Sequence, residues 1–258
     1  MKKALKILIF IPLLYLVAAP VYFTESINAK TVTDVEVILS DSADYHFITE
    51  DHIRNILFSS SGTIVGKPIK EVVLEDIENN LKSIKELRTA EAYTTANGKL
   101  VIWAEQRRPI MRVMPDEGGD YFIDDEGVVI RRRNSYNPRL HIIVGHINIS
   151  PAMLDGVSVL DTAIKNSTLR DIHYLVNHIS KNDFWSAQID QIYVDRSNGI
   201  ELIPRVGNHI VRIGNVEDIE EKLTKLETFY KDVLPEVGWN KYSVINLEFK
   251  DQIVCVKR

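Results

Sequence analysis

The sequence has a single cysteine, Cys255, among 258 residues, and its 12 glycines and 9 prolines are scattered. One cysteine allows no internal disulfide, which excludes a small disulfide-stapled extracellular scaffold. No low-complexity tract is present, so the composition gives no sign of a disordered arm. The net charge is -5 at pH 7, and such a chain offers no global basic field to nucleic acid.

Motifs for catalysis and phosphate binding are also missing. No GxGxxG, GxxxxGK or GxSxG segment occurs. The sequence therefore has neither a glycine-rich phosphate-binding loop nor the nucleophile elbow of α/β-hydrolases. The pairs His141/His146 and His173/His178 stand five residues apart, about 140° around a helix, so they do not converge on a metal. Cys255 has apolar neighbours and is interpreted as a packing residue. We therefore expect no enzyme activity, cofactor, metal or small-molecule substrate.

Two charged runs are short enough to have structural explanations. The acids 124–126 fall in a tight turn and point apart, so turn chemistry explains them better than a carboxylate site does. The arginines 131–133 indicate either a solvated strand end or a contact for an acidic partner or anionic lipid. The sequence leaves both interpretations of this second run open.

One long hydrophobic run is present, from Ile7 to Phe23, with Lys2, Lys3 and Lys6 before it and Glu25 after it. At about 1.5 Å per residue it spans about 25 Å, near the lower limit for a bilayer core. Lysines on the leading side place the N-terminus in the cytoplasm. The run predicts a single transmembrane helix, with the bulk of the chain exported.

A cleaved secretory signal peptide is the alternative for this run. Small residues at Ala18 and Ala19, and a second candidate site after Ala29, suit a signal peptidase. The run is longer than a usual signal core, however, and Pro20 directly follows Ala19, where proline is expected to obstruct cleavage. We favour a retained anchor, and both interpretations export the rest of the chain.

A strand-helix-helix-strand-strand order is predicted over about 75 residues. Alternating apolar residues predict a strand near 32–39, and Thr49 is a good N-cap for the helix that follows. A second helix is expected over about Lys70 to Lys82, and Asn97-Gly98 favours a tight turn between the last two strands. The residues expected to point inward from the second helix are Val73, Ile77 and Leu81. Three strands cannot close into a barrel, so this is a compact α+β module with one open sheet.

Beyond Pro109 the pattern is mainly β. Short strands flank the turn at 124–127, an apolar run covers 140–144, and a helix is expected from Thr168 to Ser180. A hairpin turns at 196–199. The longest helix is predicted from Asn215 as its N-cap to about Leu234. Its expected buried stripe is Ile219, Leu223, Leu226 and Tyr230.

The chain closes with a predicted hairpin, "YSVINLEF" followed by "QIVCVKR". Little sequence follows the last strand to cover it, so we expect it to be an edge strand. Its alternate apolar residues are either Ile253 with Cys255, or Val254 with Val256, and both assignments remain open at this stage.

This order of elements resembles that of the bacterial cell-division family FtsQ, called DivIB in other bacteria. The segment Tyr121–Ile130 is close to the family's aromatic-(I/L)-D-x-x-G-x-(V/I) pattern. Glu105–Val113 resembles its E-x-x-P junction, with Pro109 one residue late. Leu140–Gly145 resembles L-P-x-(I/L)-x-G, with His141 in place of proline.

The closing "INLEFKDQIVCV" resembles the family's (I/V)-D-(L/M)-R-(Y/F) strand and last hairpin. Asn246 and Glu248 stand where the family usually has Asp and Arg. The resemblance covers essentially the whole chain, and the order of the motifs carries it more than any one of them.

The resemblance implies an α+β protein with an N-terminal transmembrane helix, a small POTRA domain and a larger mixed or antiparallel β domain with helices. Residues 1–6 are expected to form the cytoplasmic tail, 7–23 the transmembrane helix and 24–31 a linker. Residues 32–108 form the POTRA domain and 109–258 the C-terminal β domain.

The resemblance further implies a non-catalytic scaffold of the divisome, in the inner (plasma) membrane at the division septum, with its bulk in the periplasm. In the family the terminal strand binds a short strand of FtsB, a coiled-coil protein joined to FtsL. Free backbone groups on an edge strand suit such strand addition. Carried to this chain, the expected partner-binding residues are Glu248, Phe249, Gln252, Val254 and Val256.

A charged rim for the partner is expected from the solvated face of the long helix, through Glu220, Lys222 and Lys225. The alternative function is a POTRA-containing export or outer-membrane assembly component. That class usually carries several POTRA repeats or a barrel of amphipathic strands, and the sequence has neither pattern.

Overall fold

The computed structural model describes residues 30–40, 47–132, 137–164, 168–197 and 199–258. The chain divides into two compact units between Arg107 and Arg108. The span predicted at 7–23 lies outside the described residues. Within the described ranges, no helix has the length and apolar character needed to cross a membrane.

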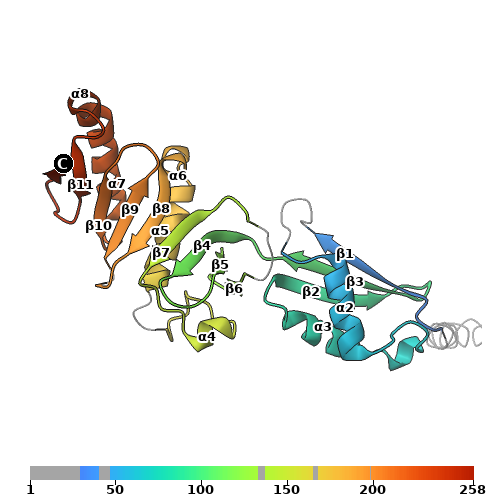
Figure 1. Ribbon diagram of the computed structural model, residues 1–258. Helices are drawn as coiled ribbons and strands as arrows, with labels where there is room; N and C mark the ends of the chain where they lie inside the picture. The colour runs from blue at the N-terminus through green and yellow to red at the C-terminus, as the bar shows by residue number, and fades with distance from the viewer. Residues whose placement is uncertain (1–29, 41–46, 133–136, 165–167, 198) are drawn as a thin grey trace, which may run out of the picture. The chain divides into compact units, whose positions relative to one another are not determined.

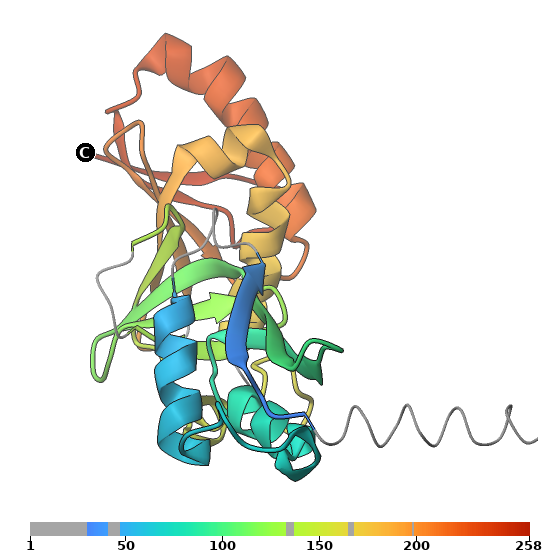
Figure 2. The ribbon, with the colours of Figure 1, turned by 90° about the vertical axis from the view of Figure 1, so that its right-hand side faces the viewer.

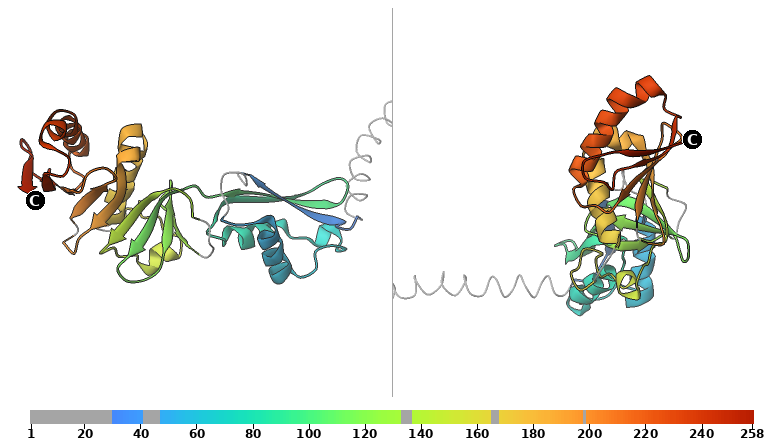
Figure 3. Two further views of the ribbon diagram at one scale, coloured as in Figure 1. Left: turned by 45° about the horizontal axis from the view of Figure 1, so that its top comes forward. Right: turned by 90° about the vertical axis from the view of Figure 1, so that its left-hand side faces the viewer.

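The first unit is a three-stranded sheet with helices on one face (Figure 1, Figure 3). Its elements are β1 (Asp34–Ser40), α2 (Glu50–Ser61), η1 (Ile69–Glu71), α3 (Leu74–Lys82), β2 (Leu87–Thr94) and β3 (Lys99–Gln106). The strand order is β1-β3-β2, with β1 parallel to β3 and β2 antiparallel to it. The predicted β-α-α-β-β order is confirmed.

Local sequence explains most of this unit. The Thr49 hydroxyl accepts a hydrogen bond from the N–H of His52, as expected of an N-cap. The predicted helix from Lys70 to Lys82 is wrong at its start, because extended backbone at Val72 and Val73 separates η1 from α3. Val73 is therefore exposed instead of pointing inward, whereas Ile77 and Leu81 are buried as predicted.

The second unit is built on one large mixed sheet. Its elements are β4 (Pro109–Pro115), β5 (Tyr121–Asp124), β6 (Val129–Arg131), β7 (His141–Gly145), α4 (Pro151–Leu154), α5 (Thr168–Ser180), α6 (Asp183–Gln188), β8 (Ile189–Val194), β9 (Ile200–Pro204), β10 (Ile210–Gly214), α7 (Ile219–Thr228), η2 (Phe229–Val233), α8 (Leu234–Val237), β11 (Tyr242–Asn246) and β12 (Val254–Lys257). In the described residues nine strands join in the order β12-β11-β10-β9-β8-β7-β4-β5-β6. Strands β4, β7 and β8 are mutually parallel neighbours, and β10 is parallel to β11.

Helices α5 and α7 cover one face of this sheet (Figure 2). The core between helices and sheet is apolar, and Trp185, Ile143 and Leu202 are among its fully buried members. The predicted stripe of α7 is confirmed, since Ile219, Leu223, Leu226 and Tyr230 are buried. Burial of this stripe fixes α7, and with it the crossover from β10 to β11, against the sheet.

The predicted start of the long helix is wrong. Asn215 does not cap it: its side chain accepts a hydrogen bond from the N–H of Glu217, which makes a local turn instead. The helix starts at Ile219, after Asp218 in a left-handed conformation (φ 52°). It then passes through η2, a π-helical turn, before α8.

The acidic run 124–126 adopts the turn role predicted for it, and two arginines of the second charged run contact neighbouring side chains. The Asp124 carboxylate accepts hydrogen bonds from the N–H groups of Val128 (2.6 Å) and Glu126 (3.1 Å), which closes the β5–β6 turn. Arg131 lies over the ring of Tyr121, 5.8 Å from its centroid, and Arg132 pairs with Asp120 at 3.0 Å. The third arginine of that run, at 133, lies outside the described residues.

Candidate functional site

The last strand, β12, lies at one edge of the nine-stranded sheet. It pairs antiparallel with β11, and no second strand among the described residues pairs with its other side. Figure 1 marks the C-terminus beside β11, at the end of the sheet opposite to β6. The expectation that the closing strand is an edge strand is confirmed.

Backbone direction identifies which groups on β12 are free. Arg258 donates its N–H to the Lys241 carbonyl, and the Ser243 hydroxyl donates to the Val256 carbonyl. The backbone groups of Val256 therefore point toward β11. Because successive residues of a strand alternate in direction, the N–H and C=O groups of Cys255 and Lys257 point to the open side.

Side-chain burial settles which face of β12 is apolar and exposed. Ile253 and Cys255 pack against the core under the helices, and burial raises the pKa of the Cys255 thiol. Val254 and Val256 point to the opposite face and are 39% and 53% exposed. The pair Val254 and Val256 is therefore the one available to a partner.

An apolar row crosses the uncovered face and ends at this edge. Ile210 of β10 is paired with Val244 of β11, which is paired with Val256 of β12, so all three side chains share one face. Ile210 is 38% exposed. A strand added beside β12 would extend this row by one more apolar position.

The neighbouring row on the same face is polar until it reaches the edge. Glu201 of β9 accepts hydrogen bonds from Arg212 of β10 at 2.8 and 2.9 Å, and Asn246 of β11 follows. Val254 of β12 ends the row. In this row the side chains therefore change from polar on β9, β10 and β11 to apolar on β12.

The loop between β11 and β12 carries the other three predicted contact residues. Strand β11 ends at Asn246, earlier than expected, because the Asn246 side chain accepts the N–H of Glu248 at 2.8 Å and turns the chain. Its amide also donates to the Glu248 carboxylate. Phe249, 46% exposed, and Gln252 then lie in the loop rather than in a strand.

Helix α7 holds this loop through hydrogen bonds from Lys225. Lys225 donates to the Phe249 carbonyl at 3.4 Å and to the Lys250 carbonyl, and pairs with Glu221 at 3.5 Å. The main chain at Phe249 is thereby held while its ring stays exposed. Lys225 thus acts on the loop directly and is not a free rim charge.

The predicted rim role of Lys222 is wrong. Lys222 is only 8% exposed, and its ammonium donates to the carbonyls of Ile213 and Asn215 and to the Asn215 side chain. Burial lowers the pKa of Lys222. This lysine ties α7 to the end of β10, whereas Glu220 remains exposed.

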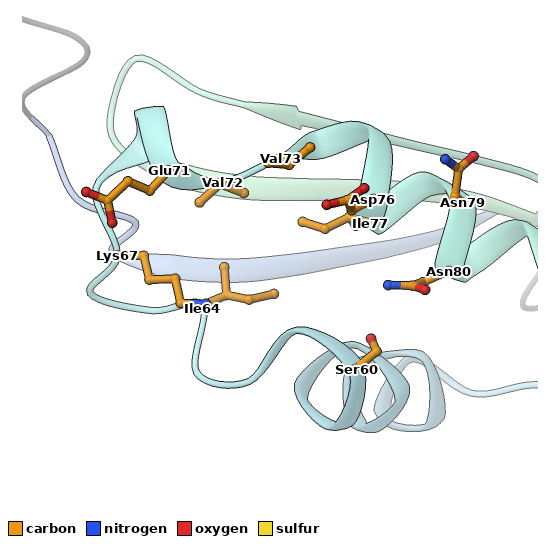
Figure 4. A pocket seen from close by; sticks show the side chains of 10 residues that line it. All are labelled: Ser60, Ile64, Lys67, Glu71, Val72, Val73, Asp76, Ile77, Asn79 and Asn80. Atoms are coloured by element: carbon orange, nitrogen blue, oxygen red, sulfur yellow. The ribbon is translucent and has the colours of Figure 1, made fainter.

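The first unit has a groove between α2, η1 and α3, with a volume of about 360 Å³ (Figure 4). Its polar side chains do not converge, since Glu71 and Asn79 lie at opposite ends. No group of three His, Cys, Asp or Glu residues in the described part of the chain has the arrangement of a metal site. His173 and His209 instead make internal hydrogen bonds, to the Asp124 carbonyl and the Tyr230 hydroxyl.

Sequence reasoning did not place Ile210 and Val244 on the same face as Val256. Alternation in "HIVRIG" showed one face of β10, but placing Ile210 next to β12 needs the parallel pairing of β10 with β11. The signal for that pairing was the helix between the two strands, since parallel neighbours need a crossover.

Comparison with protein families gives two matches that together span both units. Residues 108–256, more than half of the chain, match the family described as FtsQ/DivIB, C-terminal related. Residues 30–104 match the POTRA-like domain. Comparison with individual curated proteins gives no match.

Proposed function

Because this chain belongs to the FtsQ/DivIB C-terminal related family, and so has the role of a cell-division scaffold, we propose that it acts by strand addition at β12. A strand of a partner protein pairs with the open side of β12. The observation that carries the proposal is the free edge itself, with its apolar pair Val254 and Val256. The family is generally non-catalytic, and the proposal requires no reaction.

The energetics of such an addition favour this edge. The N–H and C=O groups of Cys255 and Lys257, which no other described strand pairs with, gain hydrogen bonds from a partner strand. Apolar partner residues beside Val254 and Val256 lose water-exposed area, at about 25 cal/mol per Å². Register is fixed, because a slip by one residue would move the partner's apolar side chains to the wrong face.

The proposed partner is a coiled-coil membrane protein of the FtsB/FtsL type. Support for this choice comes from the family and from the chemistry of the edge, which accepts a short apolar-alternating strand. The proposal places the hydrophobic run 7–23 in the inner membrane as a single span, with the exported units in the periplasm at the septum. Phe249, held by its backbone beside the edge, is the proposed aromatic anchor.

A depletion and complementation experiment tests this function. Cells depleted of the chain are expected to form filaments or chains, and the wild-type gene is expected to restore division. The Phe249→Ala variant is expected to restore it only partly, because losing an aromatic anchor weakens binding by about tenfold or more. Phe58→Ala, which removes an exposed phenylalanine of the first unit, serves as the matched control.

Intact division with misassembled envelope proteins would instead support the export alternative. Full restoration by Phe249→Ala, at wild-type protein level, would exclude Phe249 from the contact. The C-terminal match, over residues 108–256, favours the division scaffold over the export component.

A further inference from the structure

A cavity with a volume of about 770 Å³ lies where β4, β7 and β8 begin. These three strands are parallel neighbours, so their starting ends lie side by side (Figure 1). Ser180, at the end of α5, and Ser186 of α6 also line it. Strands β9, β10 and β11 separate it from β12, so it is independent of the proposed partner edge.

The charge of the lining is strongly positive for an acidic protein. Arg112, Arg139 and Arg205 line the cavity against one carboxylate, that of Asp190. Three guanidinium groups and one carboxylate leave two positive charges, although the whole chain carries -5. A local excess of this size attracts anions and concentrates them at the opening.

Arg112 is held rigidly at one side. Its Nε and Nη2 donate to the two carboxylate oxygens of Asp120 at 2.9 and 2.6 Å, and its Nη1 donates to the Asn137 side chain at 2.8 Å. Arg132 shares the same carboxylate at 3.0 Å. Asp120 thus serves two guanidinium groups, so its charge does not neutralise Arg112 alone.

The other two arginines are more available. Arg205 pairs with Asp190 at 3.2 Å, and both side chains are largely exposed, so the pair is weak and exchangeable. Arg139 is exposed and has no ion-pair or hydrogen-bond partner among the described residues. Burial lowers the pKa of His141, so this histidine lines the cavity as a neutral group at pH 7.

Three apolar side chains also line the cavity, and Ile142 is paired with Arg112 across β4 and β7. Ile110, Leu140 and Ile142 line the cavity and are all partly exposed. The volume lies within the range of small-molecule sites, about 300 to 1,000 Å³, which combine apolar walls with a few polar groups that fix orientation. An inorganic anion alone would leave most of this space to water.

We propose that this cavity binds a small organic oxyanion, with its carboxylate or phosphate group on Arg139 and Arg205 and its apolar body against Ile110, Leu140 and Ile142. Guanidinium forks match both oxyanions in a bidentate manner. Arg112 completes the positive wall from its fixed position. When the ligand binds, Arg205 exchanges its weak ion pair with Asp190 for a charge-assisted hydrogen bond to the ligand.

Amide chemical-shift titrations of the ¹⁵N-labelled full chain test this site. The probes are phenyl phosphate, phenylacetate, inorganic phosphate and benzyl alcohol. Saturable shifts are expected at Arg139, His141, Ser186 and Arg205 with the first two probes, and their relative affinities distinguish a phosphate from a carboxylate ligand. Inorganic phosphate is expected to bind about tenfold more weakly or worse, because it lacks the ring.

Three variants separate the contributions. Arg139→Gln is expected to weaken phenyl phosphate binding about tenfold or more, by loss of a charge-assisted contact. Asp190→Asn is expected to tighten phenyl phosphate binding, because the Asp190 carboxylate no longer competes with the ligand for Arg205. Arg196→Gln removes the same charge from the exposed β8–β9 turn and is expected to leave affinity unchanged.

The site would be overturned by any of three results. The first is equal binding of benzyl alcohol and phenyl phosphate, and the second is unchanged affinity in a folded Arg139→Gln variant. The third is an absence of saturable shifts around the cavity with either aromatic anion. None of these results concerns the β12 edge, so they neither support nor contradict the proposed scaffold function.

Discussion

Replacing both Val254 and Val256 with aspartate is expected to abolish partner binding while the second unit stays folded. Both side chains lie on the uncovered face of β12, at 39% and 53% exposure, so the free chain tolerates the charges. In the complex each carboxylate would be covered by the added strand, which costs more than the ~1–3 kcal/mol of a neutral polar group. Together the two changes are expected to weaken binding about 100-fold or more.

Pull-down or calorimetry with the FtsB-like partner measures this loss, and circular dichroism reports the fold. The double variant Val254→Thr, Val256→Thr keeps the β-branched shape and is expected to retain most of the binding. Val206→Asp alters an equally exposed valine in the β9–β10 turn and serves as the charge control. Wild-type affinity in the folded double aspartate variant would place the interface elsewhere.

Gly145→Ala is expected to produce the largest loss of stability in the second unit. Gly145 ends β7 with φ +107°, and a Cβ there would lie 2.2 Å from the Val194 carbonyl oxygen. That oxygen accepts the N–H of His146 and belongs to the neighbouring strand β8, so it cannot move without breaking the pairing. We expect a loss of about 4 kcal/mol or more in the free energy of unfolding.

Thermal unfolding measures this effect, with an expected fall in melting temperature of about 10 °C or more. Gly238→Ala is the matched control, because Gly238 has a similar φ of +93° but no atom within 4 Å of the added Cβ. It carries only the conformational cost, about 1–3 kcal/mol. Equal losses in the two variants would show that the contact with Val194 is not the cause.

Periodicity and turn chemistry were sufficient to predict the order of elements in the first unit and most elements of the second, but not β4, α4 or α6. The strand-helix-helix-strand-strand module followed from alternation near 32–39, the N-cap Thr49 and the Asn97-Gly98 turn. The stripe of α7 followed from its spacing. These features depend on residues close together in sequence, which is why they are accessible without tertiary contacts.

The details of the site depend on tertiary contacts, and there the sequence was ambiguous. Every residue from Ile253 to Val256 is apolar, so alternation alone cannot choose the buried pair, and the choice is made by the helices over one face. Lys222 lies three residues after Ile219 on the apolar stripe. Its burial depends on the carbonyls of Ile213 and Asn215, which only the fold brings to its ammonium group.

Hydrogen exchange at single amides of β12, in the free chain and in a saturated complex with the FtsB-like partner, tests strand addition most directly. The amides of Cys255 and Lys257 point away from β11 and are expected to exchange fast in the free chain and at least about tenfold more slowly in the complex. Val254 and Val256, which already face β11, are expected to change much less. Unchanged exchange at Cys255 and Lys257 in the saturated complex would contradict the account.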